Sequence, residues 1–277
     1  MSKIAVVTDS TSDIPAVIAE ELGISIVPAI LVINGQEYLD GETITREEYY
    51  TELPTLSPPP TTAAPSSGMF SRMYAELFQQ GYEQICSVHA ASTLSGIVNA
   101  AKIAAEHFGE RVEVVDSRHI TMGLGYQAIG AARAAAEGNM AIVLETIESI
   151  RERLKVIAML DTLEQLKRSG RVSWMRSNLG SLLQIKLFLE VQEGNVLRLG
   201  EARTRKKGIL RLAEMLAELG PLEQLTIVHT NALKEATQFA EQFSQLTPEI
   251  PLIRNVTTVI GTHVGVRGLG FVAVKGG

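Results

Sequence analysis

The 277-residue chain has little cysteine, no excess of basic residues and no long apolar run, and each shortage excludes a class of protein. Its one cysteine, Cys86, cannot form an internal disulfide, which favours a reducing compartment and predicts a cytoplasmic protein. The formal net charge of −6 argues against general nucleic-acid binding, which needs a basic surface. No apolar run reaches the roughly eighteen residues that a membrane-spanning helix needs. The N-terminus resembles a first strand more than a secretory signal.

Motifs for nucleotide, metal and acyl-transfer chemistry are also missing. The sequence has no G-x-x-x-x-G-K-[ST] loop, no kinase motifs, no H-E-x-x-H and no paired cysteines, so it predicts neither a cofactor nor a metal site. Neither Ser92 nor Ser95 lies in a G-x-S-x-G elbow. A hydrolase or phosphotransferase that uses Ser92 with His263 stays open, because geometry and not chain order defines such sites. We rank it below binding.

Short β-rich runs alternate with helical patterns along the chain, which predicts an α/β fold with a mainly parallel sheet covered on both faces. Residues 190–199 read as an antiparallel hairpin, which predicts a mixed sheet in the second half. We expect an N-terminal three-layer α/β/α domain over 1–153 and a smaller C-terminal α/β domain over 154–277, with a cleft between them. The β-rich runs are 4–7, 24–33, 85–88, 112–115, 156–160, 187–191, 225–228 and 271–274, and the helical patterns are 68–80, 94–107, 122–137, 141–154, 207–219 and 233–243.

Three of the predicted strands end in clusters of hydroxyl and carboxylate side chains, at residues 8–15, 89–96 and 115–119. The carboxyl ends of parallel strands meet at one edge of a sheet, where ligands of open α/β sheets bind. Ser92 and Ser95 are the candidates in the second cluster. For each cluster the alternative is helix capping, which needs the same residue types.

A proline-rich segment, residues 53–67, shows no periodicity and predicts a long surface loop. It contains five prolines, and Ser66 or Ser67 suffices to cap the helix that follows. Thr62 is left over. A loop stiffened by proline could hold its hydroxyl toward an oxygen of a ligand.

The second half offers Arg171, His263 and a basic stretch as candidates. Arg171 follows Gly170 at the end of a predicted helix, so its guanidinium could pair with an acid across the cleft or bond the helix carbonyls. His263 lies among four glycines in residues 261–270, which lets the backbone approach a ligand closely, although a lone histidine is more often structural. Residues 203–207 form either an exposed helix start or a docking surface.

Six collinear motifs give the chain a resemblance to the DegV family of bacterial fatty-acid-binding proteins. They are T-D-S-T-S-D-I-P at 8–15, T-A-A-P-S at 62–66, S-T-L-S-G at 92–96, V-V-D-S-R with M-G-L-G at 114–125, L-K-R-S-G-R-V-S at 166–173 and G-T-H-V-G at 261–265. The resemblance implies two α/β domains that enclose one fatty acid as the bound ligand. It also implies a separate fatty-acid kinase subunit as the partner, which phosphorylates the carboxylate that the non-enzymatic carrier presents.

The same resemblance assigns roles to individual residues. Thr62 and Ser92 fall on positions that hydrogen-bond the fatty-acid carboxylate, and we expect Ser95 and Gly96, in the same turn as Ser92, to bind the ligand as well. Arg171 and His263 fall on positions near that head group. For partner binding, the corresponding positions are Arg203, Lys206 and Lys207.

Overall fold

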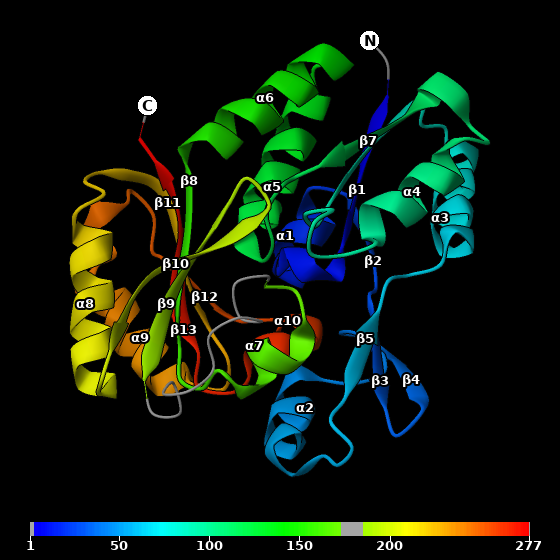
Figure 1. The fold of residues 1–277 in the computed structure, drawn as a ribbon. Coiled ribbons are helices and arrows are strands. Elements are labelled where there is room, and N and C mark those ends of the chain that lie inside the picture. Colours follow the sequence, from blue (N-terminus) through cyan, green and yellow to red (C-terminus); the bar gives the residue numbers. More distant parts are fainter. Residues whose placement is uncertain (1–2, 173–184, 277) are drawn as a thin grey trace. The chain divides into compact units, whose positions relative to one another are not determined.

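The computed structural model describes residues 3–172 and 185–276, and its contacts divide the chain into two compact units (Figure 1). The first unit comprises Met1–Ile30 and Thr62–Glu152, and the second comprises Leu31–Thr61 and Arg153–Gly277. The contacts thus group residues 31–61 with the C-terminal half. The sequence-based domains, 1–153 and 154–277, stay a prediction.

The first unit is built on a parallel four-stranded sheet in the order β2-β1-β6-β7. Every residue of β1 is buried, as expected of a parallel strand covered on both faces. The register pairs Val7 of β1 with Ser87 of β6, and His89 of β6 with Asp116 of β7, so these strands end at the same edge. The strands are β1 (Ile4–Asp9), β2 (Ile24–Val27), β6 (Gln84–His89) and β7 (Val112–Asp116).

Helices cover both faces of this sheet, as the alternating pattern predicts. In Figure 1, α5 and α6 lie on one side of β1 and β7, and α3 and α4 lie on the other. Helix α5 is buried along most of its length, and a Cβ added at Gly125 would lie 2.5 Å from the carbonyl oxygen of Ser12. The M-G-L-G motif therefore packs a helix tightly on the turn after β1. The helices are α1 (Ala16–Glu21), α3 (Ser67–Gln79), α4 (Ile97–Ala105), α5 (Met122–Ala135) and α6 (Met140–Arg153), with short 3-10 turns η1 (Ser10–Ser12) and η3 (Gly109–Arg111).

The second unit contains a mixed six-stranded sheet in the order β10-β9-β8-β13-β11-β12. Only the pair of β11 and β12 in this sheet is parallel. The predicted hairpin is confirmed: β9 and β10 pair antiparallel through Glu193 and Gly194, whose φ angles of 49° and 74° suit a tight turn. The strands are β8 (Leu154–Leu160), β9 (Lys186–Gln192), β10 (Asn195–Ala202), β11 (Leu222–His229), β12 (Leu252–Asn255) and β13 (Leu269–Lys275).

Helices α8 and α9 close the main core of the second unit. Leu212 and Leu216 of α8 join Phe239 of α9 and Phe271 of β13 in one buried cluster. The helices of this unit are α2 (Arg46–Glu52), α7 (Glu164–Ser169), α8 (Arg205–Ala217), α9 (Leu233–Gln242) and α10 (Thr258–Val264), with 3-10 turns η2 (Leu53–Thr55) and η5 (Ser244–Leu246).

The proline-rich segment is more structured than its composition suggests. It contains the turn η2 and the strand β5 (Thr61–Ala63), which belongs to a small sheet in the order β4-β3-β5 with β3 (Ile30–Ile33) and β4 (Gln36–Leu39). The long loop predicted over 53–67 is therefore interrupted by these two short elements.

Within residues 3–172 and 185–276, the structure contains no helix that is both long and apolar enough to cross a membrane.

Candidate functional site

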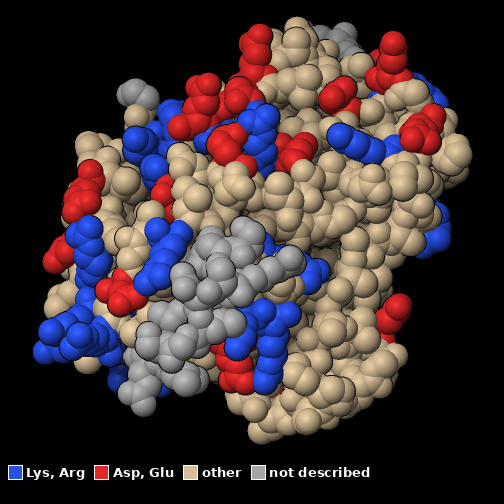
Figure 2. Space-filling view, in the orientation of Figure 1, with Lys and Arg blue, Asp and Glu red and all other residues tan. Residues whose placement is uncertain are grey.

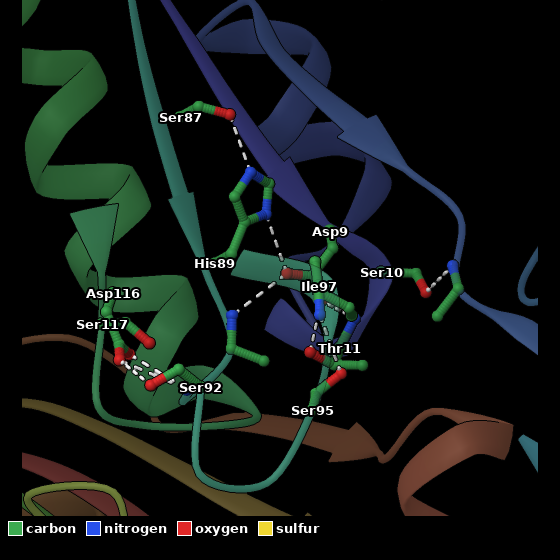
Figure 3. A network of polar contacts seen from close by, with 12 residues as sticks. Asp9, Ser10, Thr11, Ser87, His89, Ser92, Ser95, Ile97, Asp116 and Ser117 are labelled. Carbon is green, nitrogen blue, oxygen red and sulfur yellow. Dashed lines mark hydrogen bonds and ion pairs between the residues drawn. The ribbon is translucent and has the colours of Figure 1, made fainter. Parts of the chain in front are cut away.

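Asp9, the last residue of β1, organises the sheet edge in the first unit (Figure 3). Its Oδ1 accepts hydrogen bonds from the backbone N–H of Thr11, at 3.1 Å, and from the Thr11 hydroxyl. Its Oδ2 accepts from Nδ1 of His89, at 3.0 Å, and from the backbone N–H of Ala90, at 3.1 Å. One buried carboxylate thus ties the turn after β1 to the end of β6.

The network continues inward from His89. Its Nε2 lies 2.7 Å from Oγ of Ser87, which lies 2.7 Å from the hydroxyl of Tyr74. Ser87 and His89 lie two positions apart in β6, so their side chains point to the same face of the sheet. Burial raises the pKa of Tyr74 well above its ordinary value, so the phenol stays protonated. The order of groups matches a Ser-His-Asp triad, but all are fully buried and have no access to a substrate, so the network is structural.

The other polar side chains of the T-D-S-T-S-D motif also bond within the first unit. Oγ of Ser10 accepts from the N–H of Ala29 at 3.1 Å, and the hydroxyl of Thr121 donates to Oδ2 of Asp13 at 2.6 Å. Asp13 has a φ of 58°, a left-handed conformation that aspartate tolerates at turns. These contacts favour the turn-building interpretation of the motif.

Ser92 lies in the exposed turn after β6 and contacts Asp116, the last residue of β7. Its hydroxyl donates to Oδ2 of Asp116 at 2.5 Å, and its backbone N–H lies 3.3 Å from both carboxylate oxygens. The N–H of Arg118 also donates to Oδ1 of Asp116, at 2.9 Å. The sequence placed Asp116 in the strand-end cluster 115–119, but did not single it out as a site residue or as a partner of Ser92.

Ser95 and Gly96 start helix α4. Oγ of Ser95 accepts from the N–H of Ile97 at 3.4 Å, and Gly96 is the N-cap residue. For Ser95, the helix-start alternative therefore accounts for the observed contact.

The segment that carries Thr62 lies against this turn. Thr62 is half-buried in β5, and a Cβ added at Gly96 would lie 3.7 Å from the Cβ of Ala64, two residues further on. The structure therefore brings the segments of two predicted ligand-binding residues, Thr62 and Ser92, to one place in the first unit.

In the second unit, Val172 and Val264, the sequence neighbours of Arg171 and His263, pack in one apolar cluster. Nη1 of Arg171 donates to the carbonyl oxygen of Ser169 at 2.7 Å, which is the helix-end role weighed from the sequence. Burial lowers the pKa of His263 to about 4, and the positive charge of Arg171 adds to this effect. His263 is therefore neutral at pH 7. A single site that joins these two residues to Thr62 and Ser92 stays a prediction. The L-K-R-S-G-R-V-S motif ends at Ser173, which lies outside the described residues.

The basic stretch at the start of α8 divides into two parts. Arg205 is half-buried, with its Nη1 2.9 Å from Oδ1 of Asp161 and its Nε 2.7 Å from Oε1 of Glu235. The remaining basic residues, Arg203, Lys206 and Lys207, are exposed. Figure 2 shows Lys and Arg side chains gathered over the part of the surface that α8 occupies. Arg205 therefore anchors the helix start, and its basic neighbours face solvent.

Comparison with known proteins defines the class. The model of the DegV family, a family described as uncharacterised, matches residues 3–276. A DegV domain-containing protein of Listeria monocytogenes is 31% identical over 97% of both chains, and one of Staphylococcus aureus is 31% identical over 99% of this chain and all of its own. The chain belongs to the DegV family, as its motifs predict.

Two solved structures of the same fold are described as fatty acid binding. A fatty-acid-binding DegV family protein of Thermus thermophilus is 32% identical, with a TM-score of 0.89 over 99% of both chains. DegV of Bacillus subtilis, described as a fatty acid binding protein, is 28% identical, with a TM-score of 0.87 over 99% of this chain and all of that one.

Proposed function

We propose that this protein is a cytoplasmic, non-enzymatic carrier that binds one long-chain fatty acid and presents its carboxyl group to a separate kinase, which forms an acyl phosphate. The acyl chain occupies an apolar tunnel, and the carboxyl group lies at Thr62 and Ser92. Ser95 and Gly96 shape the same turn. Arg171 and the neutral His263 complete the head-group site.

The observation that carries this proposal is the likeness to the Thermus thermophilus protein, which is described as binding a fatty acid. It covers almost the whole chain at 32% identity, so it includes the segments of Thr62 and Ser92. The proximity of Ala64 and Gly96 supports a shared role for these two segments.

The acyl chain and the head group play different parts in binding. Burial of about fifteen methylene groups at roughly 0.8 kcal/mol each would contribute about 12 kcal/mol before the loss of rigid-body and chain freedom. A hydrogen bond between a hydroxyl and the head group adds about 0.5–1.5 kcal/mol, or about 1.5–3 kcal/mol where the head group is charged. The tail therefore supplies most of the affinity, and the polar residues fix which end of the lipid reaches the opening.

Mass spectrometry of the purified protein tests the binding step. We expect native spectra to show a mass increment of one acyl chain per protein, and solvent extraction to release free fatty acids. Thr62→Val keeps the shape of the side chain and removes the hydroxyl, so it should weaken palmitate binding about tenfold or more without abolishing it. A protein that carries no acyl chain and binds none after delipidation would contradict the proposal and favour the enzyme that uses Ser92 and His263.

Coupling to a kinase is tested separately. Arg203, Lys206 and Lys207 are exposed together at the start of α8, and a partner with an acidic surface would be attracted to them. Arg203→Glu should reduce acyl phosphate formation by the kinase and leave lipid retention intact. Arg211→Glu is a matched control, because Arg211 is exposed on the same helix but pairs with Glu214 and Glu218. If Arg203→Glu releases the lipid, or if both variants reduce coupling equally, the docking assignment is wrong.

A further inference from the structure

The Ser92 hydroxyl carries a single hydrogen, and the structure shows where it points. That hydrogen is donated to Oδ2 of Asp116 over 2.5 Å (Figure 3). A serine hydroxyl has one donor and two acceptor lone pairs. With the donor used, Ser92 meets a ligand as a hydrogen-bond acceptor.

Asp116 is held so that this orientation persists. It ends β7, whose register with β6 pairs it with His89. Its carboxylate accepts from the backbone N–H of Arg118 at 2.9 Å and lies 3.3 Å from the backbone nitrogen of Ser92. A carboxylate accepts hydrogen bonds and donates none, so it orients the neighbouring hydroxyl in one direction.

We propose that Asp116 is a positioning residue that makes Ser92 an acceptor, so that the site selects a head group that donates a hydrogen bond, namely the un-ionised carboxylic acid. The proposal rests on the proposed function and deepens it. The acid O–H donates to Oγ of Ser92, which donates to Asp116, so the hydrogen bonds run in one direction.

Charge supports the same choice. A ligand bound at Oγ of Ser92 lies two hydrogen bonds from the Asp116 carboxylate. Two negative charges this close repel each other, which disfavours an anionic ligand at this position. The Asp116 carboxylate already accepts from the N–H groups of Ser92 and Arg118, so the ligand is the partner that supplies the hydrogen for Oγ of Ser92.

Two ligands with the same carbon skeleton test the proposal. The alcohol 2-heptadecanol donates and accepts hydrogen bonds, whereas 2-heptadecanone only accepts. Each would compete with radiolabelled palmitate on the delipidated full-length protein. We expect the wild-type protein to bind the alcohol about tenfold or more tightly than the ketone, because the ketone leaves two acceptors facing each other.

Asp116→Asn should reduce this preference to about threefold or less, because its amide N–H can donate to Oγ of Ser92 and turn the hydroxyl toward the ligand. Ser92→Ala removes the acceptor and should give the same loss, which keeps the test valid if Asp116→Asn folds poorly. Ser10→Ala is the matched control. The hydroxyl of Ser10 accepts the N–H of Ala29, so this variant should retain the alcohol preference.

The outcomes separate the two proposals. Palmitate binding without any preference of the wild-type protein for the alcohol overturns the role of Asp116 and leaves the carrier function standing. A preference that survives in both Asp116→Asn and Ser92→Ala also overturns it. If the wild-type protein binds no palmitate, the carrier function itself fails and this inference fails with it.

Discussion

Replacing Asp9 with alanine should destabilise the first unit by about 4 kcal/mol, because its carboxylate serves four donors inside the protein. These are the N–H and hydroxyl of Thr11, Nδ1 of His89 and the N–H of Ala90. The Thr11 hydroxyl can rotate to another acceptor, which leaves three fixed N–H groups. At about 1–3 kcal/mol for each buried donor without a partner, the sum is about 3–9 kcal/mol. Water that enters the vacated space lowers this sum, so we expect a value near its lower end.

The assay is urea unfolding combined with hydrogen exchange read by mass spectrometry. Exchange resolves peptides from β1 and β6 and so reports on the first unit by itself. Ser10→Ala is the matched control. Its hydroxyl accepts one backbone N–H, that of Ala29, so its loss should cost about 1 kcal/mol. If Asp9→Ala and Ser10→Ala lower the free energy of unfolding equally, the network around Asp9 does not stabilise the unit as argued.

Three further predictions follow from buried groups. Gly261→Ala should lower the free energy of unfolding of the second unit by about 2–3 kcal/mol in urea, because the added methyl would overlap the buried ring of Tyr50. Gly68→Ala is the control. Its methyl would lie 3.7 Å from its nearest neighbour, so it should change stability by less than about 0.5 kcal/mol. Cys86 should resist iodoacetamide at pH 8 until the protein unfolds, because burial raises the pKa of its thiol to about 12. Burial lowers the pKa of His229 from 6.5 to about 4. Between these two pH values the residue is protonated in the unfolded state and neutral in the folded state, so the free energy of unfolding should decrease as the pH falls from 6.5 to about 4. Urea midpoints at pH 7 and pH 5 should therefore differ less in His229→Gln than in the wild-type protein.

The sheet of the first unit could be predicted because its information is local. The strands β1, β6 and β7 are short apolar runs between helical patterns, and the carboxyl ends of parallel strands meet at one edge. The hairpin of β9 and β10 was predictable from its turn residues, Glu193 and Gly194.

The placement of residues 31–61 in the second unit could not be predicted in the same way. It depends on contacts such as that of Asp40, whose Oδ1 accepts the N–H and the hydroxyl of Thr258 at 3.1 and 2.7 Å. The two residues are more than two hundred positions apart, and the local sequence of residues 31–61 does not indicate that they pair. Contacts between residues far apart in the sequence, and not local secondary-structure propensity, decide where this segment packs.

The candidate site was predicted as a set of residue types, whereas the roles of those residues needed the structure. Ser95 and Arg171 make the helix-end contacts that their neighbours in the sequence allow. The partnership of Asp9 with His89 was missed because the two are 80 positions apart. The spacing of Ser87 and His89, two positions apart in β6, was a local signal that places both side chains on the same face of the strand.

The two strand-end carboxylates also define what the edge of the first unit offers a ligand. Anion sites at the ends of parallel strands commonly use backbone N–H groups that face the ligand. Here Asp9 and Asp116 accept such groups themselves, from Thr11, Ala90, Ser92 and Arg118. The exposed Ser92 hydroxyl is also directed at a carboxylate. Because these donors are used internally, this part of the edge presents acceptors, and a head group that keeps its proton complements it better than an anion does.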